Sequence, residues 1–188
     1  MKEKTCNKSY ITTISGRRFD PTAPDREDID ITDIAHSLSL ICRANGHFKA
    51  FFSVARHCVN CEKEAAARGY PVRVRLLCLL HDAAEAYMGD MTRPLKRQLP
   101  YYRDCEARLI GDILAALGID PPDEEEAALV KEIDDAMLCH EFRIFNGDVL
   151  IAPPPVIHID IEHSERPFTE TKAEFLELYH ALREEVQS

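Results

Sequence analysis

A histidine and an aspartate stand side by side at the end of an apolar run, as His81-Asp82 in LLCLLHDAAEAYMGD. An imidazole next to a carboxylate suits a divalent transition metal, because borderline ions accept both nitrogen and oxygen ligands. A His-Asp pair alone is common, so the interpretation depends on its company. Glu85 follows His81 by four residues, and Asp90 comes just after a predicted helix stop at Gly89. The pattern indicates a metallohydrolase.

His57, upstream, and Asp134, downstream, complete a candidate ligand set. Asp134 lies in VKEIDDAML, next to an inward-facing apolar stripe that includes Ile133 and Met137. An aspartate on the core side of a helix needs a partner or a metal. Asp135 is then the solvated neighbour, although the two aspartates could exchange roles. Two His and two Asp from separate helices predict one divalent ion, which could be Mn, Co, Fe, Ni or Zn.

The composition is that of a globular protein with an acidic surface. The 188 residues are 45% apolar and 30% charged, with a net charge of −10. This size favours one domain, and the negative charge argues against nucleic acid as a partner. No apolar run is long enough to span a membrane, and MKEKTCNKSY has no apolar stretch after its lysines. We therefore expect a cytoplasmic protein whose partner is a small molecule.

Seven scattered cysteines favour reduced thiols, because the number is odd and no secretion signal is recognised. Cys58 and Cys61 form one CxxC directly after His57. A structural zinc site usually needs a second such pair, so we expect small buried side chains on one helix face. A helical protein with a CxxC-centred structural zinc is the open alternative.

Hydrophobic spacing predicts an all-α bundle of six or seven helices. The first 28 residues are expected to form an irregular lead-in with a short strand near 10–14, and residues 29–188 to form a single helical domain. Within that domain the core covers 29–145, and an irregular excursion at 146–167 could include one short strand. The predicted helices cover about residues 29–43, 53–68, 72–88, 100–117, 123–145 and 168–186.

The chain resembles the HD-domain phosphohydrolase superfamily over about residues 29–141. The segments that carry the resemblance are LICRANGH, SVARHCV, LLHDAAEAYMGDMTRPLK and VKEIDDAML. The resembling branch contains bacterial 5′-deoxynucleotidases and phage-encoded nucleotide phosphohydrolases. The resemblance implies an HD-type helical bundle, a homo-oligomer, and hydrolysis of a nucleotide phosphate by a metal-activated water. The implied metal ligands are His57, His81, Asp82 and Asp134.

The same resemblance assigns roles to the neighbouring polar residues. Glu85 matches the acid–base residue of the nucleotidases, and Asp90 matches a second essential carboxylate. Arg43 matches the arginine that grips the phosphate, a role for which its bidentate fork is suited. Further contacts to phosphate are implied for Thr92, Arg93 and Lys96.

The sequence departs from the deoxynucleotidases after the phosphate arginine, where Ala44 replaces a large aromatic residue that helps to exclude a 2′-hydroxyl. His47 could fill part of the gap or simply be a turn residue. The most direct expectation is hydrolysis of a nucleoside 5′-monophosphate. A triphosphohydrolase, which would use extra cations, and a non-catalytic nucleotide-binding module are the alternatives.

Overall fold

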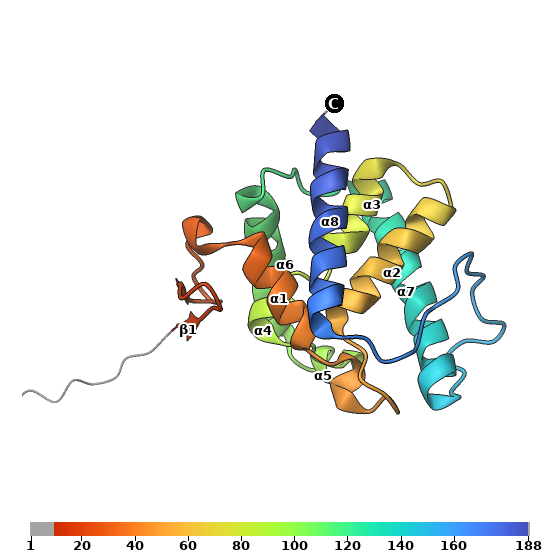
Figure 1. The fold of residues 1–188 in the computed structure, drawn as a ribbon. Coiled ribbons are helices and arrows are strands. Elements are labelled where there is room, and N and C mark those ends of the chain that lie inside the picture. Colours follow the sequence, from red (N-terminus) through yellow and green to blue (C-terminus); the bar gives the residue numbers. More distant parts are fainter. Residues whose placement is uncertain (1–9, 188) are drawn as a thin grey trace, which may run out of the picture.

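The computed structural model describes residues 10–187, so residues 1–9 of the predicted lead-in lie outside the described part. The described chain is all-α, as predicted, and its helices pack into one bundle (Figure 1). A small antiparallel hairpin precedes them. The elements are β1 (Ile11–Thr12), β2 (Arg18–Phe19), η1 (Arg26–Asp28), α1 (Ile31–Leu40), η2 (Arg43–Gly46), α2 (Val54–Ala67), α3 (Val72–Leu80), α4 (Glu85–Met88), α5 (Arg93–Lys96), α6 (Pro100–Ala116), α7 (Glu124–Asn146) and α8 (Phe168–Gln187).

The central element is α3, which contacts α2, α7 and α8. Leu76, Leu79 and Leu80 on this helix are at most 1% exposed. Burial of such side chains contributes about 1.5–3 kcal/mol each, which explains why a helix that is apolar nearly all round takes the middle of the bundle. The apolar run that precedes His81-Asp82 thus forms the buried centre of the bundle.

Capping residues fix the starts of two helices. The Ser53 side chain accepts a hydrogen bond from the backbone N–H of Arg56 at the start of α2. Asp123 and Glu126 form a reciprocal capping box at the start of α7. Each such cap is typically worth about 1 kcal/mol, so these residues set where the two site-bearing helices begin.

The predicted helix over 72–88 is wrong as a single element. α3 ends at Leu80, and the backbone turns through residues 81–84 before α4 begins at Glu85. The hydrogen bonds in this turn span three residues instead of four, as in the bond from the Ala83 N–H to the Leu80 carbonyl at 2.9 Å. Ser37 of α1 also donates to the Ala86 carbonyl at 2.7 Å, which is a tertiary contact with α4. His81 and Asp82 therefore lie in a turn rather than within a helix.

The predicted helix over 29–43 also ends early. α1 stops at Leu40, and Arg43 begins the 3₁₀ turn η2. The Arg43 N–H donates to the Phe52 carbonyl at 2.8 Å, so the chain is pinned to the segment leading into α2. Ala44 and Asn45 both adopt a left-handed φ of 53°, which non-glycine residues rarely do. Arg43 is thus held by a strained turn and is not a helix C-terminal residue.

The excursion at 146–167 runs along α2 without forming a strand, so the short strand considered there is not observed. Glu64, fully buried on α2, accepts hydrogen bonds from the backbone N–H groups of His158 and Ile159 at 2.8 and 3.2 Å. Burial raises the pKa of the Glu64 carboxyl, but hydrogen bonds from His158 and Arg68 outweigh it and lower the pKa below 4.5. The ionised carboxylate anchors this segment.

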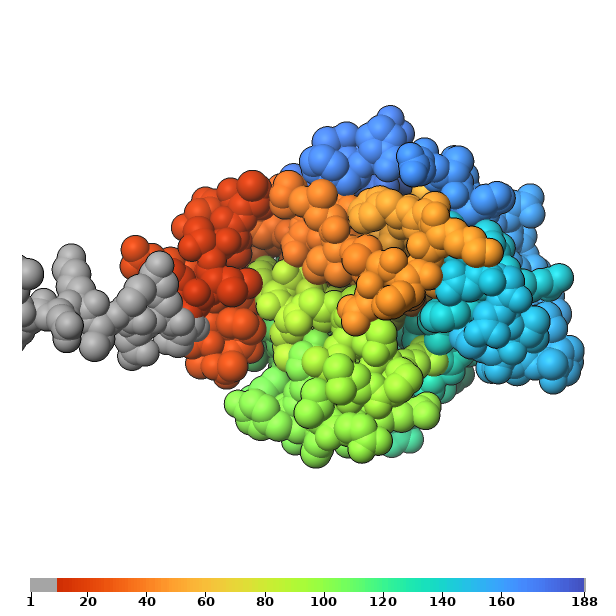
Figure 2. Space-filling view, turned by 90° about the horizontal axis from the view of Figure 1, so that it is seen from below, coloured from red at the N-terminus to blue at the C-terminus, as the bar shows by residue number. Residues whose placement is uncertain are grey.

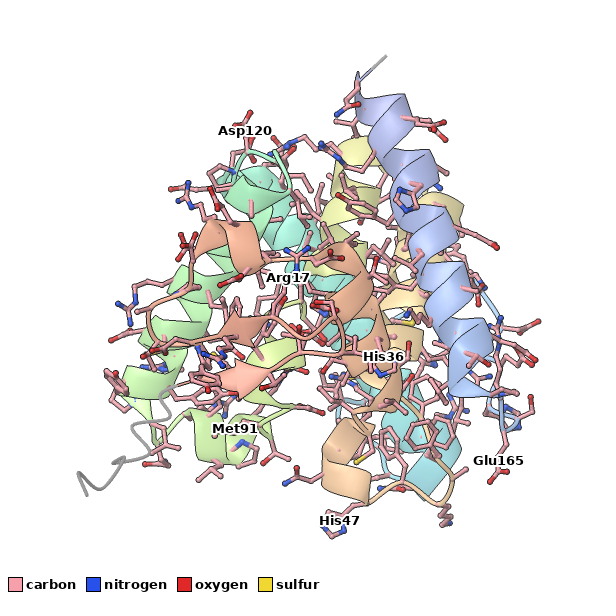
Figure 3. The ribbon with its side chains drawn as sticks, turned by 60° about the vertical axis from the view of Figure 1, so that its left-hand side comes forward. Arg17, His36, His47, Met91, Asp120 and Glu165 are labelled. Carbon is pink, nitrogen blue, oxygen red and sulfur yellow. The ribbon has the colours of Figure 1, made fainter. Side chains whose placement is uncertain are left out.

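The N-terminal strand prediction is partly correct. Ile11–Thr12 pairs antiparallel with Arg18–Phe19, a partner strand that the sequence did not reveal. Figure 3 shows this hairpin lying against α1, with Arg17 in the hairpin and His36 on the helix. Among residues 10–187, no helix combines the length and apolar composition that crossing a membrane requires.

Candidate metal centre

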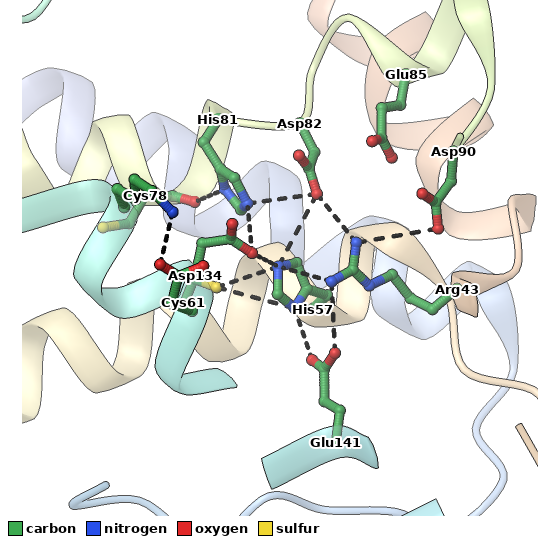
Figure 4. Close-up of polar contacts among 12 residues, drawn as sticks. Arg43, His57, Cys61, Cys78, His81, Asp82, Glu85, Asp90, Asp134 and Glu141 are labelled. Atoms are coloured by element: carbon green, nitrogen blue, oxygen red, sulfur yellow. Dashed lines mark hydrogen bonds and ion pairs between the residues drawn. The ribbon is translucent and has the colours of Figure 1, made fainter. Parts of the chain in front are cut away.

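The four predicted ligands converge from three elements (Figure 4). His57 comes from α2, His81 and Asp82 from the turn after α3, and Asp134 from α7. Nε2 of His57 lies 3.3 Å from Asp134 Oδ1 and 3.9 Å from Asp82 Oδ2. Nε2 of His81 lies 3.3 Å from Asp82 Oδ2 and 3.9 Å from Asp134 Oδ1.

These separations match those of atoms that share one ion. Ligand atoms about 2.1 Å from a metal lie roughly 3.0 Å apart when adjacent in an octahedron and roughly 4.2 Å apart when opposite. The four nitrogen–oxygen distances, from 3.3 to 3.9 Å, fall within that range. The side chains therefore need little movement to hold a common ion.

Both histidines are oriented by acceptors on their other ring nitrogen. Nδ1 of His57 lies 2.6 Å from Glu141 Oε1, and Nδ1 of His81 lies 2.7 Å from the Cys78 carbonyl oxygen. Each contact places the proton on Nδ1 and leaves the Nε2 lone pair for a ligand or a donor. Such outer partners are a regular feature of metal-binding histidines.

Sequence reasoning missed Glu141, which is fully buried on α7. The signal was its spacing, because a residue seven positions after Asp134 lies on the same helix face. An uncompensated carboxylate in a protein core is costly, so its burial points to a partner. The partner, His57, is 84 residues away in the chain and could not be seen from the local pattern.

One buried atom tests whether a metal fits here. Nε2 of His81 has no hydrogen-bond partner among the described residues, although it is shielded from solvent. Asp82 Oδ2 is 3.3 Å away but is not aligned to accept a hydrogen bond. A buried nitrogen without a partner costs roughly 1–3 kcal/mol, and coordination of a metal ion would satisfy it. The donor set and this orphan atom both fit a divalent ion.

The charge around the histidines favours a cation. Burial and Arg43 lower the pKa of His57, but Glu141 and Asp134 outweigh them and raise it. For His81, burial again lowers the pKa, and Asp82 raises it well above the ordinary value. Carboxylates that stabilise a proton on imidazole would stabilise a metal ion at the same place.

The two aspartates are correspondingly poised as anions. Burial raises the pKa of Asp82, yet His81 and Arg43 more than reverse this and hold it well below its usual range. Burial likewise raises the pKa of Asp134, but a hydrogen bond with His57 and the charge of His81 more than reverse this and hold the pKa well below its usual range. Both are ready to act as anionic ligands at neutral pH.

Arg43 is 8% exposed and reaches into the centre. Its Nη1 lies 3.4 Å from Asp82 Oδ2 and 4.0 Å from Asp90 Oδ2, and its Nη2 lies 3.5 Å from Glu141 Oε2. Burial alone would lower the pKa of Arg43, but the surrounding carboxylates raise it. Nη2 also lies 3.3 Å from Nε2 of His57, so the arginine and a metal ion would compete for the lone pair of that nitrogen.

Glu85 and Asp90 sit beside Asp82 on the cavity side of the centre (Figure 4). Burial, followed by the charges of Asp82 and Asp90, raises the pKa of Glu85 to about 10. Burial also raises the pKa of Asp90, although Arg43 opposes the change. A carboxyl group that keeps its proton at neutral pH can donate it, which is the property of a general acid.

A cavity of about 350 Å³ opens over these groups. Figure 2 shows the surface hollowed between the orange segment around η2 and the green segment around α5. Phe48 and Phe142 form part of its apolar wall, facing Arg43. His47 is exposed and points away from the molecule in Figure 3, so it is a turn residue and does not replace the missing aromatic. Phe48, one residue later, lines the cavity instead.

The other predicted phosphate contacts line this cavity but two of them are already paired. Arg93 donates to Asp134 Oδ2 and to Asp135 Oδ1, both at 2.6 Å. Lys96 donates to Glu106 at 2.7 Å. Thr92 lines the cavity and is the N-cap residue of α5, a one-turn helix that the sequence did not predict. Asp134 faces the centre, and Asp135 faces outward.

A second cavity, of about 590 Å³, lies on the other side of α5. It shares Arg93, Lys96 and Asp134 with the first cavity, but its walls are more apolar and include Leu77 and Leu114. Although it is larger, it lacks the buried acid and arginine of the first cavity. The smaller cavity is therefore the better candidate for a reaction.

Cysteines surround the histidines on the core side. Cys58, Cys61 and Cys78 are at most 1% exposed, which confirms that they are small buried side chains, and the six described cysteines form no disulfide. The ligand atoms of His57, Cys61 and His81 lie within 4.8 Å of one another, and so do those of Cys58, His81 and Asp82. These groups overlap the His/Asp set, which we favour for a reaction because its two aspartates line the cavity beside Arg43.

Fold and site together define an all-α protein with a buried His/Cys/Asp cluster that could hold a metal ion. No model of a known protein family matches the sequence. The uncharacterized protein YfdR of Escherichia coli (strain K12) is 40% identical over 135 residues, which cover 72% of this chain and 71% of YfdR. The uncharacterized protein RCAP_rcc00048 of Rhodobacter capsulatus is 33% identical over 189 residues, or 93% of this chain and 96% of the relative. The chain belongs to the family that includes these two proteins.

Proposed function

We propose that this protein is a metal-dependent phosphohydrolase of the HD type that acts on a nucleotide, most directly a nucleoside 5′-monophosphate. The observation that carries the proposal is the placement of a buried arginine and a buried carboxyl of raised pKa in the lining of one cavity, beside Asp82 and Asp134 of the His/Asp ligand set. His57, His81, Asp82 and Asp134 would hold the ion. A divalent ion there supplies an acidified water and a positive charge against a phosphate oxygen.

The residues around the ligands would bind the phosphate and protonate the leaving group. Arg43 offers a planar fork to phosphate oxygens, and its carboxylate partner Asp90 orients that fork. Glu85, whose pKa is raised to about 10 by burial and by its acidic neighbours, holds the proton that a leaving alkoxide needs. General acid catalysis of this kind contributes about 10²–10⁴-fold to rate.

The cavity supports an organic leaving group of nucleoside size. Its volume of about 350 Å³ lies within the range of small-molecule sites, and Phe48, Leu138 and Phe142 give it an apolar wall. Aromatic rings are natural stacking partners for a nucleobase. Ala44 leaves room beside Arg43, so strong selection against a ribose 2′-hydroxyl is not expected.

The ion pairs favour a monophosphate over a triphosphate. A longer phosphate chain would need additional cations, yet Arg93 is held by Asp134 and Asp135, and Lys96 by Glu106. Arg43 lies within 4.0 Å of Asp82, Asp90 and Glu141, and Lys96 lies 3.7 Å from the buried Glu85 in addition to its bond with Glu106. A triphosphohydrolase would first have to break these pairs, at an energetic cost that a monophosphatase avoids.

The test is a substrate screen with defined metals. Protein stripped with a chelator is supplied separately with Mn²⁺, Co²⁺, Ni²⁺, Fe²⁺ or Zn²⁺ and given nucleoside mono-, di- and triphosphates. Inorganic phosphate and tripolyphosphate are measured separately. Phosphate release from monophosphates supports the proposal, and tripolyphosphate release identifies the triphosphohydrolase. Tight nucleotide binding without hydrolysis under every metal would instead identify a binding module.

A further inference from the structure

Two thiols lie beside the candidate centre and have no part in the proposed hydrolysis. Sγ of Cys61 lies 3.5 Å from Nε2 of His57, the same nitrogen that would bind the catalytic ion. Cys61 follows His57 by one helical turn on α2, so the helix presents both side chains on one face. Cys58 forms the second thiol-containing group with His81 and Asp82.

The cysteine spacing is that of ligands rather than of packing alone. Buried cysteines are common as small apolar side chains, and burial by itself would carry no inference. Here the sulfur of Cys61 and ring nitrogens of His57 and His81 lie within 4.8 Å of one another. His81 adds a buried Nε2 without a hydrogen-bond partner. Sulfur and two imidazoles around an unsatisfied nitrogen form a ligand set with softer character than the His/Asp set.

We propose that the centre has a second ligand set, made of His57, Cys61 and His81 with Asp134 as the fourth ligand, that binds thiophilic divalent ions such as zinc and cadmium. This inference rests on the proposed function for its consequence, which is competition between thiophilic ions and the catalytic ion. The ligand set itself does not depend on the proposed function. Thiolate selects soft ions, whereas carboxylate and water suit harder ions such as manganese.

Binding through sulfur is a simple exchange of a proton for a metal. The S–H bond of Cys61 breaks, a sulfur–metal bond forms, and the proton passes to water, because a coordinating thiol is deprotonated by the ion. No oxidant is needed. Asp134 lies outside the group whose ligand atoms are within 4.8 Å of one another, but its Oδ1 is 3.3 Å from His57 Nε2 and 3.9 Å from His81 Nε2. A shift of its side chain would supply the fourth ligand of a tetrahedral site. A metal site whose four ligands all come from the protein is typical of structural zinc sites, because no coordination position is left for a substrate.

The sulfur lies on the side opposite the reaction groups. Figure 4 shows Cys61 and Arg43 on opposite sides of His57, with Glu85 and Asp90 on the Arg43 side. An ion drawn toward Cys61 moves away from the cavity that contains Arg43. Zinc or cadmium held in this way would therefore occupy the centre without assisting phosphate hydrolysis. The thiol thus restricts hydrolysis to the protein that carries a harder ion such as manganese.

The experiment uses cadmium as a probe of sulfur ligation. The purified protein is stripped of metal and titrated with Cd²⁺ while the ultraviolet thiolate-to-metal charge-transfer band is recorded. The same titration is run on Cys61→Ser and on the matched control Cys105→Ser, whose buried thiol lies on α6 away from the centre. Competition titrations with Mn²⁺ give the affinity of each protein for the harder ion.

We expect one Cd²⁺ per chain with a charge-transfer band in the parent protein and in Cys105→Ser, and no band in Cys61→Ser. Loss of the sulfur should weaken Cd²⁺ binding by more than about 100-fold, the upper end of the effect of losing a residue that only hydrogen-bonds a ligand. It should weaken Mn²⁺ binding less than Cd²⁺ binding. ¹¹³Cd NMR of the parent protein reports sulfur ligation without any variant, should Cys61→Ser fail to fold.

Cd²⁺ bound without a sulfur signal overturns the inference, and so does a band that persists in Cys61→Ser but disappears in Cys58→Ser. Mn²⁺-dependent nucleotide hydrolysis by the parent protein is measured in parallel. Hydrolysis without Cd–sulfur ligation removes this inference and leaves the proposed function standing. Cd–sulfur ligation without hydrolysis supports the ligand set and refutes the hydrolase.

Discussion

The role of Glu141 gives a prediction that depends on the structure, because its partner His57 lies 84 residues away in the chain and cannot be read from the local pattern. The change is Glu141→Gln, which keeps the shape and one acceptor oxygen. Glu141 is fully buried, and its Oε1 lies 2.6 Å from Nδ1 of His57 while its Oε2 lies 3.5 Å from Nη2 of Arg43. The substitution removes the charge from both contacts.

The magnitude follows from these two contacts. The bond to His57 falls from a charge-assisted strength of about 1.5–3 kcal/mol to a neutral one of about 0.5–1.5 kcal/mol. Arg43 keeps Asp82 and Asp90, so the buried guanidinium is not left unpaired. We expect the metal-free protein to lose about 1–2 kcal/mol of unfolding free energy. Loss of an outer-shell partner should raise the metal dissociation constant about 10–100-fold.

The assay is a competition titration of metal against a chromophoric chelator, with urea unfolding of the metal-free protein in parallel. Glu125→Gln is the matched control, because Glu125 is an exposed residue on the same helix. Its effect should stay within about 0.5 kcal/mol. A metal affinity for Glu141→Gln within twofold of the parent value would refute the reasoning, because His57 would then need no carboxylate to orient it.

Three further changes test other parts of the account. Glu85→Gln should retain the metal and lower turnover by about 10²–10⁴-fold, and unchanged turnover would reduce Glu85 to a structural residue. Arg43→Lys should fold and bind metal normally but lower kcat/KM by about 10–100-fold, because a point charge cannot replace a bidentate fork worth about 1.5–3 kcal/mol; a parental kcat/KM would move the phosphate site elsewhere. Because the folded-state pKa of Glu64 is lowered below 4.5, its ionised form stabilises the protein at neutral pH, and this stability is lost as the pH falls through the folded pKa. Urea unfolding should show that Glu64→Gln is less stable than the parent at neutral pH and that the difference shrinks below pH 4.5; a difference that does not change with pH would contradict this assignment.

Much of the fold could be predicted because local signals agree with tertiary structure. Ser53 and Asp123 start helices where capping rules place them, and the apolar run over 72–80 becomes the central helix. These signals lie within a few residues of the structure they determine. The all-α class follows from them.

The failures occur where distant contacts override local preference. Ala83, Ala84 and Glu85 are good helix formers, and nothing nearby announces the break between α3 and α4. That break is accompanied by the hydrogen bond from Ser37 of α1 to the Ala86 carbonyl. Local propensity cannot register a donor 49 positions away.

The candidate site shows the same division. His57, His81, Asp82 and Asp134 have residue types that suit a metal, and the structure brings them together. What the sequence could not supply is the environment, such as the outer-shell carboxylate and the thiols on the core side. Glu141 became apparent only when α7 was placed beside α2, and the approach of Cys61 to His81 only when α2 was placed beside the turn after α3.

The central claim is that an ion is held by the inward aspartate of α7 together with the two histidines. The most direct measurement is the metal content, by elemental analysis, of the parent protein, Asp134→Ala and Asp135→Ala after equilibration with Mn²⁺ and removal of excess metal. The neighbouring aspartate is the control, because both side chains pair with Arg93 but Asp134 alone approaches His57 and His81. We predict about one ion per chain in the parent and in Asp135→Ala, and little or none in Asp134→Ala. Equal metal content in the two variants, or no metal in the parent, would contradict the account.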